Sequence, residues 1–541
     1  MSNGGKPKGN GKAAGGAEAE HTGWKPSFNP WLIAVSVTLA AFMEILDTTI
    51  VNVALPHIAG SLAASNDEAT YALTSYLTAN GIVLTVSGWI SDTIGRKRYF
   101  LICLGMFTVF SFLCGIATSL PQLIIFRAFQ GFFGGGLQPN QQAIILDTFP
   151  PEKRGAAFGL TAIATIVAPV LGPTLGGWIT DTYSWRWIFF VNVPVGIFAV
   201  VINFILVEDP PWEKEKQKRK TRGIDYIGLS LISLGLGCLQ VMVDKGEDWD
   251  WFGSPIIRTL AVLAFLGIGG AIVWLLTAKK PIVNLDIFKD KNFAIGCLFI
   301  GAMGAILYAS SVIIPQFAQT ELGYTATVSG LILSPGGLVV IVLIPIVGQL
   351  MTRIATRYIV MFGFFLMGCA CFYSAGLVSN IDFKTLVYMR SAQTAALGFL
   401  FVPISQIAYL TLPLRYRSDG AAIFSMFRNV FGSIGISISS AMVTERTQID
   451  QANLSKFMTP LHAGYNEYLQ KAEATIMTLG RAPSTIESVA QGQLYQTYMK
   501  QAATLAYSNV FMYASVIAFC VVPFCFLITK KKASGGGGGG H

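Results

Sequence analysis

The feature that most constrains this chain is a succession of apolar segments, each long enough to cross a lipid bilayer. One crossing needs about 20 apolar residues, and hydrophobic residues make up 53% of the 541 positions. Charged residues are only 12%, against about 25% in an ordinary soluble domain. We therefore predict an all-α integral membrane protein with fourteen transmembrane helices, which excludes a soluble enzyme. The expected spans are 31–57, 71–91, 99–117, 122–147, 156–180, 187–207, 225–243, 258–277, 293–320, 329–351, 358–378, 385–412, 420–444 and 507–529.

The distribution of basic residues orients these spans. With the N-terminus placed in the cytoplasm, 26 of the 38 lysines and arginines fall in inner segments and nine in outer segments, five of these in one long loop near 445–506. Cytoplasmic loops carry the excess of Lys and Arg in membrane proteins, so we expect both termini to be cytoplasmic. The net charge of +9 is then a matter of topology, and no nucleic-acid partner is expected.

Two halves of the chain repeat each other. The stretch 123–130 recurs at 386–393, Gly155-Ala-Ala recurs at Gly420, and 88–97 has a weaker echo at 348–357. Parallel six-helix repeats imply a pseudo-twofold axis along the membrane normal and a central cavity where the halves meet. The predicted domains are an N-terminal tail 1–30, a six-helix bundle 31–207, a linker with an inserted helix pair 208–292, a second six-helix bundle 293–529 with an external loop 445–506, and a C-terminal tail 530–541 that ends in an added glycine–histidine tag.

Several kinds of chemistry lack the residues they would need. The four histidines, His21, His57, His462 and His541, are too scattered for a metal site, and the eight cysteines lie in apolar segments. No Walker-type glycine loop occurs, and no nucleophile, base and orienting group cluster in any loop. We therefore expect no metal, no cofactor and no enzymatic reaction.

One cytoplasmic loop carries a specific motif after the second span. Gly88, Asp92, Gly95, Arg96 and Lys97 stand in the pattern G-x-x-x-D-x-x-G-R-K. Glycine allows close helix approach and a tight turn, and the aspartate can cap a helix or pair with a cation. A plain basic anchor would need neither. This loop resembles the signature of the major facilitator superfamily, in which it is expected to act as a cytoplasmic gate.

Within that superfamily the chain is most similar to the fourteen-span drug:proton antiporters, particularly the EmrB-like multidrug exporters. The resemblance spans roughly residues 30 to 530 and rests on the motifs at 46–56, 127–131, 168–177 and 185–194. The third resembles the antiporter motif, with Ala168 where glycine is usual. A simple Gly/Pro kink is its alternative reading. Its small or kinking residues are Gly172, Pro173, Gly176 and Gly177.

Three charged residues lie where charge is costly. Asp47 is nine residues from Pro56, which places it about 14 Å from the outer end of its span. Glu44 lies on the same helix face, and Arg127 lies about 9 Å deep in the fourth span. We predict that Asp47 and Glu44 form a coupled proton site that Arg127 tunes. Two alternatives remain: Asp47 bonds only to nearby backbone or hydroxyl groups, or Arg127 extends outward to the interface.

Other polar residues within spans are candidates for the cavity and the gate. Arg96 is expected to latch to Asp147 when the transporter opens outward. Arg390 has the position of a structural anchor, and Arg428 has no obvious acidic partner in the sequence. The substrate-cavity candidates are Gln130, Gln138, Asn140, Gln141, Gln142, Gln316, Gln319 and Gln406.

The resemblance implies export of hydrophobic or amphiphilic drugs across the bacterial cytoplasmic membrane, driven by inward proton flow. It also implies contacts with lipids and a tripartite pump with a periplasmic adaptor and an outer-membrane channel, for which the loop 445–506 would be the docking element. That loop contains four tyrosines between 465 and 498 and is expected to form a small folded cap. Alternatives are a dedicated exporter of one metabolite, peptide or siderophore, a receptor or scaffold without transport, and a passive lid in place of a docking element.

Overall fold

The computed structural model describes residues 26–211, 225–278, 281–413, 416–478 and 483–528. Every regular element in these ranges is helical, and each of the fourteen expected spans coincides with one helix or with a helix pair in line. The first bundle contains α2 (Pro30–Ser61), α3 (Asn66–Ile94), α4 (Arg96–Gly115), α5 (Leu120–Gly134), α6 (Leu137–Thr148), α7 (Pro151–Thr182), α8 (Trp187–Phe190) and α9 (Asn192–Leu206). The second contains α13 (Lys291–Thr320), α14 (Ala326–Arg353), α15 (Thr356–Ser374), α16 (Phe383–Gly398), α17 (Phe401–Leu410), α18 (Arg417–Leu454), α19 (Ala463–Thr478) and α20 (Pro483–Val521), followed by the short η6 (Val522–Leu527). Between the bundles lie α11 (Tyr226–Lys245) and α12 (Pro255–Thr277).

Length and hydropathy alone identify fewer spans than the helices themselves. Eleven described helices are long and apolar enough to cross a membrane, or twelve if α7, bent by 42° between Pro169 and Leu171, is counted as one span. The spans below that threshold are α3 and the α5–α6 pair. Both carry polar side chains that are buried inside the protein, such as Asn80 and Gln138, and these lower the mean hydropathy of a span without exposing polar groups to lipid.

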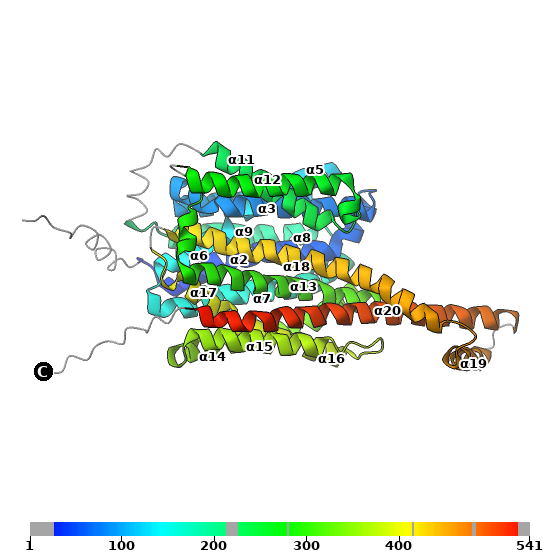
Figure 1. Ribbon diagram of the computed structural model, residues 1–541. Coiled ribbons are helices and arrows are strands. Elements are labelled where there is room, and N and C mark those ends of the chain that lie inside the picture. The colour runs from blue at the N-terminus through cyan, green and yellow to red at the C-terminus, as the bar shows by residue number, and fades with distance from the viewer. Residues whose placement is uncertain (1–25, 212–224, 279–280, 414–415, 479–482, 529–541) are drawn as a thin grey trace, which may run out of the picture.

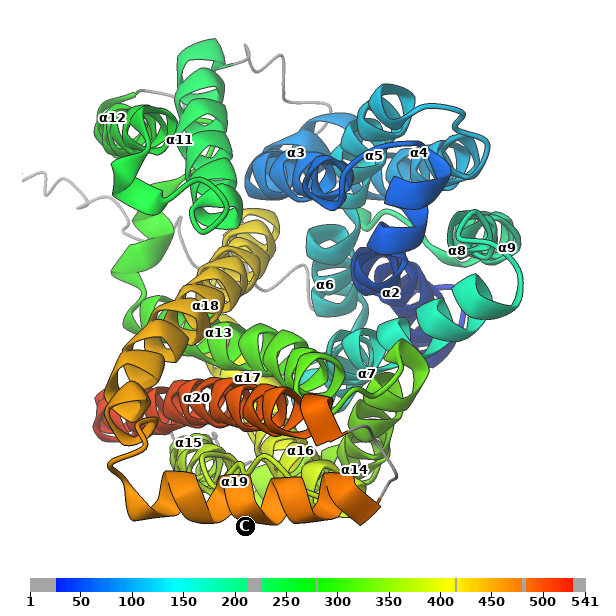
Figure 2. The ribbon, with the colours of Figure 1, turned by 90° about the vertical axis from the view of Figure 1, so that its right-hand side faces the viewer.

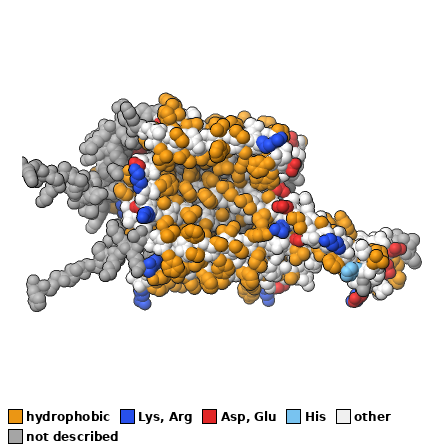
Figure 3. Space-filling view, in the orientation of Figure 1, with side chains coloured by type: hydrophobic (Ala, Val, Ile, Leu, Met, Phe, Trp, Pro, Cys, Tyr) orange, Lys and Arg blue, Asp and Glu red, His pale blue; other side chains and the backbone are white. Residues whose placement is uncertain are grey.

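The helices run side by side in a bundle with two distinct ends (Figure 1). We call the end where α2 begins and η6 ends the terminal face, and the end that carries α19 the arm face. Hydrophobic side chains cover the middle of the side shown in Figure 3, and charged side chains gather toward the two ends. This distribution is the one a bilayer requires, because charge is costly at membrane depth. The chain is therefore a multi-pass membrane protein.

The halves meet through helices of both bundles. Viewed from the arm face, α7 lies against α14, and α18 lies beside α3 and α6 (Figure 2). Small residues allow these close approaches. A Cβ atom added to Gly330 of α14 would lie 2.6 Å from the Thr174 backbone nitrogen of α7, and one added to Gly88 of α3 would lie 2.9 Å from the Ser418 carbonyl oxygen of α18. Gly88, the first glycine of the loop motif, thus lies at the junction between the two halves.

The inserted pair α11–α12 packs against both halves on one side (Figure 2). Toward α18, Gln240 donates a hydrogen bond to Ser433 Oγ at 2.7 Å, and Ser433 donates to Asp244 at 3.2 Å. Toward α3, the Lys245 ammonium donates to the Thr70 hydroxyl and lies 4.8 Å from the Tyr71 ring centroid. One inserted helix therefore contacts both bundles.

Beyond the arm face the chain forms a helical arm, which consists of the end of α18, α19 and the start of α20 (Figure 1). The sequence placed the ends of the adjoining spans at 444 and 507, whereas α18 continues to Leu454 and α20 begins at Pro483. Hydropathy falls where a helix leaves the membrane, and the helix itself need not stop there. A small apolar cluster of Ile476, Ile486 and Ala490 holds α19 to α20.

We predict that Gly172→Val destabilises the first bundle. A Cβ atom at Gly172 would lie 2.1 Å from Thr49 Oγ1 of α2, so α2 and α7 would have to separate, at a cost of about 1–3 kcal/mol. The thermal unfolding midpoint in detergent should fall. The matched control is Gly105→Val, because nothing lies within 4 Å of a Cβ added there. Equal midpoints for the two variants would contradict the close packing of α2 on α7.

Candidate functional site

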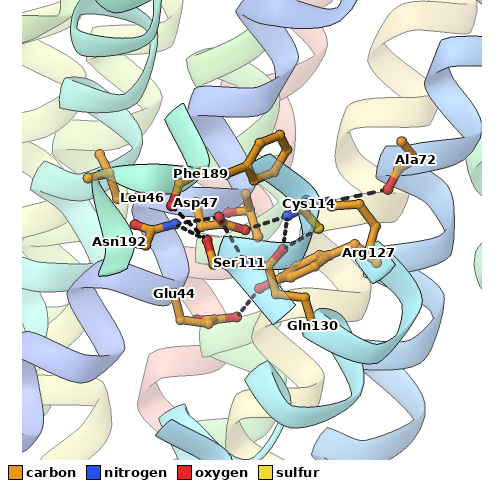
Figure 4. A network of polar contacts seen from close by, with 12 residues as sticks. Glu44, Leu46, Asp47, Ala72, Ser111, Cys114, Arg127, Gln130, Phe189 and Asn192 are labelled. Carbon is orange, nitrogen blue, oxygen red and sulfur yellow. Dashed lines mark hydrogen bonds and ion pairs between the residues drawn. The ribbon is translucent and has the colours of Figure 1, made fainter. Parts of the chain in front are cut away.

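A buried ion pair lies at the centre of the first bundle. Arg127 Nη1 is 2.6 Å from Asp47 Oδ2, and neither side chain is exposed to solvent. The other carboxylate oxygen, Oδ1, accepts hydrogen bonds from Asn192 Nδ2 at 2.7 Å and Gln130 Nε2 at 3.0 Å. Figure 4 shows these side chains converging from α2, α5 and α9. Asp47, a predicted member of the proton site, and Arg127, predicted to tune that site, are thus in direct contact.

The surrounding groups satisfy most of the remaining hydrogen-bonding capacity of this pair. Gln130 Oε1 accepts from Arg127 Nη1 at 2.9 Å, and the guanidinium lies 4.1 Å from the Tyr76 ring centroid. Asn192 also donates to Ser111 Oγ of α4 at 3.1 Å. A buried ion pair is tolerated only when such further bonds offset its loss of hydration. Side chains of α5 and α9 therefore bond the Asp47 carboxylate directly, and Ser111 of α4 and Tyr76 of α3 support those side chains.

A second carboxylate, Glu44, lies one helical turn before Asp47. It is 2% exposed and accepts hydrogen bonds from Asn80 Nδ2 at 2.9 Å, Gln138 Nε2 at 2.5 Å and the Tyr76 hydroxyl at 3.3 Å. Tyr76 therefore lies between the two acidic sites. Its hydroxyl donates to Glu44, and its ring faces the Arg127 guanidinium that pairs with Asp47. Glu44 itself has no direct cationic partner among the described residues; its bonds are to neutral donors.

Glu44 is linked to the second half through Gln138. While the Gln138 amide nitrogen donates to Glu44, its oxygen accepts a hydrogen bond from Arg428 Nη2 of α18. Arg428 is 1% exposed and also lies within 3.5 Å of Thr165 Oγ1 on α7. The sequence left Arg428 without a role because its acidic counterpart is reached through an amide and across the junction of the halves.

The loop motif forms a polar cluster near the terminal face. Arg96 forms an ion pair with Asp147 and donates to Ser418 Oγ of α18 at 2.6 Å. Arg417, also on α18, lies 3.2 Å from the other oxygen of Asp147. Two arginines from different halves thus share one carboxylate that is 4% exposed. The expected Arg96–Asp147 contact is present, and the second half takes part in it.

The other motif residues serve local geometry. Gly95 has a φ of +103°, a backbone conformation that side-chain-bearing residues rarely adopt. Two residues on, the Lys97 backbone N–H donates to Asp209 Oδ1 at 2.9 Å, and the Lys97 ammonium lies 5.2 Å from the Phe204 ring centroid. Asp92 is buried at 7% exposure. These contacts tie the loop to the end of α9.

The remaining cavity candidates are spread over several environments. Gln142 accepts a hydrogen bond from the Tyr409 hydroxyl of α17 at 2.8 Å, which is a contact between the halves. Asn140 donates to the Gly136 carbonyl oxygen at 2.6 Å, within its own helix. Gln316 and Gln406 are half-buried, and the side-chain oxygen of each lacks a hydrogen-bond partner in the part of the chain that the structure describes. Of the cavity candidates, only Gln130 and Gln138 donate hydrogen bonds to a described carboxylate, Gln130 to Asp47 and Gln138 to Glu44.

Sequence reasoning missed three neutral partners of the carboxylates. Asn192 lies in the quoted motif 185–194, but nothing in its spacing indicated that it reaches Asp47. Tyr76 and Asn80 stand four residues apart on α3 and therefore on one helix face, a signal that could have suggested a shared polar partner. Among the described residues, no group of three or more His, Cys, Asp or Glu side chains is placed to hold a metal ion.

Comparison with known proteins identifies the superfamily of this chain. Residues 37–436 match the Major Facilitator Superfamily. The fold is similar to that of the proton:xylose symporter XylE, with a TM-score of 0.55 at 15% identity over 91% of this chain and 96% of that one. The expectation of a major facilitator fold is therefore confirmed.

Sequence relatives narrow the class further. The multidrug export protein EmrB of Escherichia coli K12 is 36% identical over 457 residues, 84% of this chain and 88% of the relative. The fatty acid resistance protein FarB of Neisseria gonorrhoeae is 32% identical over 500 residues, 92% of this chain and 95% of the relative. The chain belongs to the major facilitator superfamily and, within it, to the EmrB-like family.

We predict that Asp147→Ala loosens the contact between the halves at the terminal face. Removing the shared carboxylate takes away the one group that both Arg96 and Arg417 contact, and breaking a buried ion pair typically costs about 3–5 kcal/mol. A cysteine introduced at Ala422, which is 1% exposed on α18, should then react several-fold faster with a water-soluble maleimide, on a background in which the native cysteines are replaced by alanine.

The matched control is Asp209→Ala, which removes a carboxylate on the same face that bonds within the first half only. Labelling at the same rate in both variants would contradict a latch between the halves. Unimpaired transport after charge reversal at Arg96 would contradict it as well.

Proposed function

We propose that this protein is a proton-coupled antiporter that exports hydrophobic or amphiphilic compounds from the cytoplasm by alternating access. The observation that carries the proposal is the buried Asp47–Arg127 pair, held by neutral hydrogen-bond donors from neighbouring helices. A carboxylate that deep in a membrane protein is costly, and proton exchange is the function that a titratable group uniquely supplies there.

Protonation of Asp47 would change which helices hold together. The ionised carboxylate attracts the Arg127 guanidinium, and a proton on either oxygen removes that ion pair. Arg127 would keep its contacts with Gln130, the Ala72 carbonyl oxygen at 3.4 Å and the Tyr76 ring. The contact between α2 and α5 therefore depends on the proton, whereas the contact between α5 and α3 does not.

Glu44 supplies a route from the first half to the second. Its ionised form accepts from the Gln138 amide, whose oxygen in turn accepts from Arg428 of α18. A proton or a cationic substrate at Glu44 would weaken the hold on Gln138 and free Arg428 to move with its own helix. We propose that this chain of three residues couples occupancy of the site to the relative position of the halves.

The substrate class is proposed from the relatives. Two relatives of this chain are named for multidrug export and for fatty acid resistance, and fatty acids are amphiphilic. We propose a location in the bacterial cytoplasmic membrane with both termini in the cytoplasm. The terminal face is then the cytoplasmic face, and the Arg96–Asp147–Arg417 cluster closes it. No enzymatic step is part of this function.

We further propose that the arm docks a periplasmic adaptor, which would connect the exporter to an outer-membrane channel. The arm carries three large apolar side chains with high exposure, namely Phe457 at 54%, Leu461 at 97% and Met477 at 60%. Such residues on an extramembrane element favour protein contact.

Asp47→Asn should abolish proton-driven transport. Reconstituted in proteoliposomes with an imposed pH gradient, wild type should move a fluorescent lipophilic substrate against its gradient, while Asp47→Asn should show at least a tenfold lower rate and no substrate-induced proton flux, because it cannot exchange a proton.

Glu44→Gln should retain binding of neutral substrates and lose the response to cationic ones. Glu467→Gln, which removes an exposed charge on the arm, is the matched control and should behave as wild type.

The same assay separates the alternatives. Proton-coupled transport of a single compound in a panel of chemically diverse substrates would favour a dedicated exporter. Transport in wild type that is insensitive to both an uncoupler and Asp47→Asn would refute the proton coupling, and no transport of any compound would favour a receptor or scaffold.

Replacing residues 458–482 by a short glycine–serine linker should abolish adaptor capture without affecting transport into the lumen of proteoliposomes. The linker keeps α18 and α20 joined, since they end at Leu454 and begin at Pro483. The measurement is co-purification of a co-expressed adaptor. Undiminished co-purification would disprove docking on α19.

A further inference from the structure

The second half contains a copy of the polar site that has lost its acid. Adding 263 to the numbers of Asp47, Ser111, Arg127 and Gln130 gives Ser310, Ser374, Arg390 and Gln393. The structure brings these four together as it does the first four: Arg390 Nη1 donates to Ser310 Oγ at 2.6 Å and lies 3.4 Å from Gln393 Oε1, and Gln393 Nε2 donates to Ser374 Oγ at 2.8 Å. The repeat is therefore a repeat of a site as well as of helices.

The two copies differ in charge balance. Where Asp47 neutralises Arg127, the equivalent Ser310 leaves Arg390 with hydroxyl and amide oxygens only; the second hydroxyl, Ser311 Oγ, accepts from Nη2 at 2.7 Å. The Arg390 side chain is 0% exposed, and its Nε has no hydrogen-bond partner in the part of the chain that the structure describes. Arg390 forms no ion pair with any described residue. This is a fully buried cation with one donor unused.

Such an arrangement favours an anion. An uncompensated charge in a low-dielectric interior is strongly disfavoured because it has lost its hydration, and neutral hydroxyls offset only part of that loss. A hydroxyl can also reverse its role, because it carries one donor and two acceptor sites. Ser310 and Ser311 donate to the Leu307 carbonyl oxygen at 3.1 Å and 2.7 Å. With an anion beside the guanidinium, these two hydroxyls can redirect that donation from Leu307 to the anion.

The packing around Arg390 limits the size of the occupant. The Thr394 hydroxyl, one turn after Arg390, donates to the Arg390 carbonyl oxygen at 2.5 Å. A Cβ added to Gly336 of α14 would lie 2.4 Å from Thr394 Oγ1. Because α14 packs this closely against α16, we expect the site to exclude an organic head group and to admit at most a single ion. We propose that Arg390, Ser310 and Ser311 form a binding site for one small monovalent anion of the chloride class, in the second half of the protein.

This site is independent of the proposed proton coupling. It would hold its ion whether or not Asp47 exchanges protons, and its role would be to supply to the second bundle the negative charge that Asp47 supplies to the first. Its test therefore measures anion binding and not transport.

The experiment compares the thermal unfolding midpoint of the purified full-length protein, followed by tryptophan fluorescence, in sodium chloride and in sodium gluconate at equal ionic strength. Wild type should unfold at least about 2 °C higher in chloride, with a saturable dependence on its concentration, because a ligand that binds only the folded state stabilises it by mass action. Arg390→Gln should remove this difference. Ser310→Asp should remove it too, since the new carboxylate occupies the place of the anion, as Asp47 does in the first half.

Arg446→Gln serves as the matched control, because it removes a half-buried arginine that donates a hydrogen bond to the Tyr513 hydroxyl and should leave the chloride effect intact. If Arg390→Gln does not fold, the second measurement is an anomalous difference map from bromide-soaked crystals of wild type, in which a peak is expected beside Arg390. The proposal is overturned if wild type unfolds at the same temperature in both salts, if Arg390→Gln or Ser310→Asp retains the chloride effect, or if bromide is absent from that position.

Discussion

The loss of hydration that a charge suffers inside an apolar bundle governs the interior of this protein. Each buried charge must find an opposite charge, a set of dipoles or an occupant, because lipid and packed side chains offer none. The three fully buried arginines differ in the group that compensates their charge. Arg127 faces the Asp47 carboxylate, Arg428 faces the Gln138 amide and, through it, Glu44, and Arg390 faces two serine hydroxyls.

The contacts of the buried arginines also determine how the two halves are joined. The Asp47–Arg127 pair lies wholly within the first bundle, whereas Arg428 and Arg417 reach into it from α18. One of these crossings ends near Glu44, at the depth of the acidic cluster, and the other ends at Asp147, near the terminal face. The single helix α18 therefore contacts the first half at two depths, near Glu44 and at Asp147. Because α18 is one helix, a movement at one of these contacts also displaces the other.

What the sequence could predict follows from what each signal measures. Hydropathy located most of the spans, since burial in lipid acts on every residue of a helix, and the internal repeat predicted a division into two halves. The pairing of Asp47 with Arg127 was foreseeable because similar depth in two spans is enough to suggest contact. Asn192 and Tyr76 were not, because their contacts depend on how α9 and α3 rotate against α2. The link from Glu44 to Arg428 was hidden by the intervening amide of Gln138.

The arm has a mechanical consequence. α18 is one continuous helix of 38 residues, about 57 Å long at 1.5 Å per residue, and it runs from the cluster at Asp147, past Arg428, to the base of α19. α20, 39 residues long, returns alongside it. A tilt of the second bundle in the membrane is therefore carried outward by a pair of stiff levers, and the tip of the arm swings through a wider arc than the helices at the bilayer centre. A protein bound at the tip would be displaced in each transport cycle, and a partner that prevented this displacement would stop the second bundle from moving.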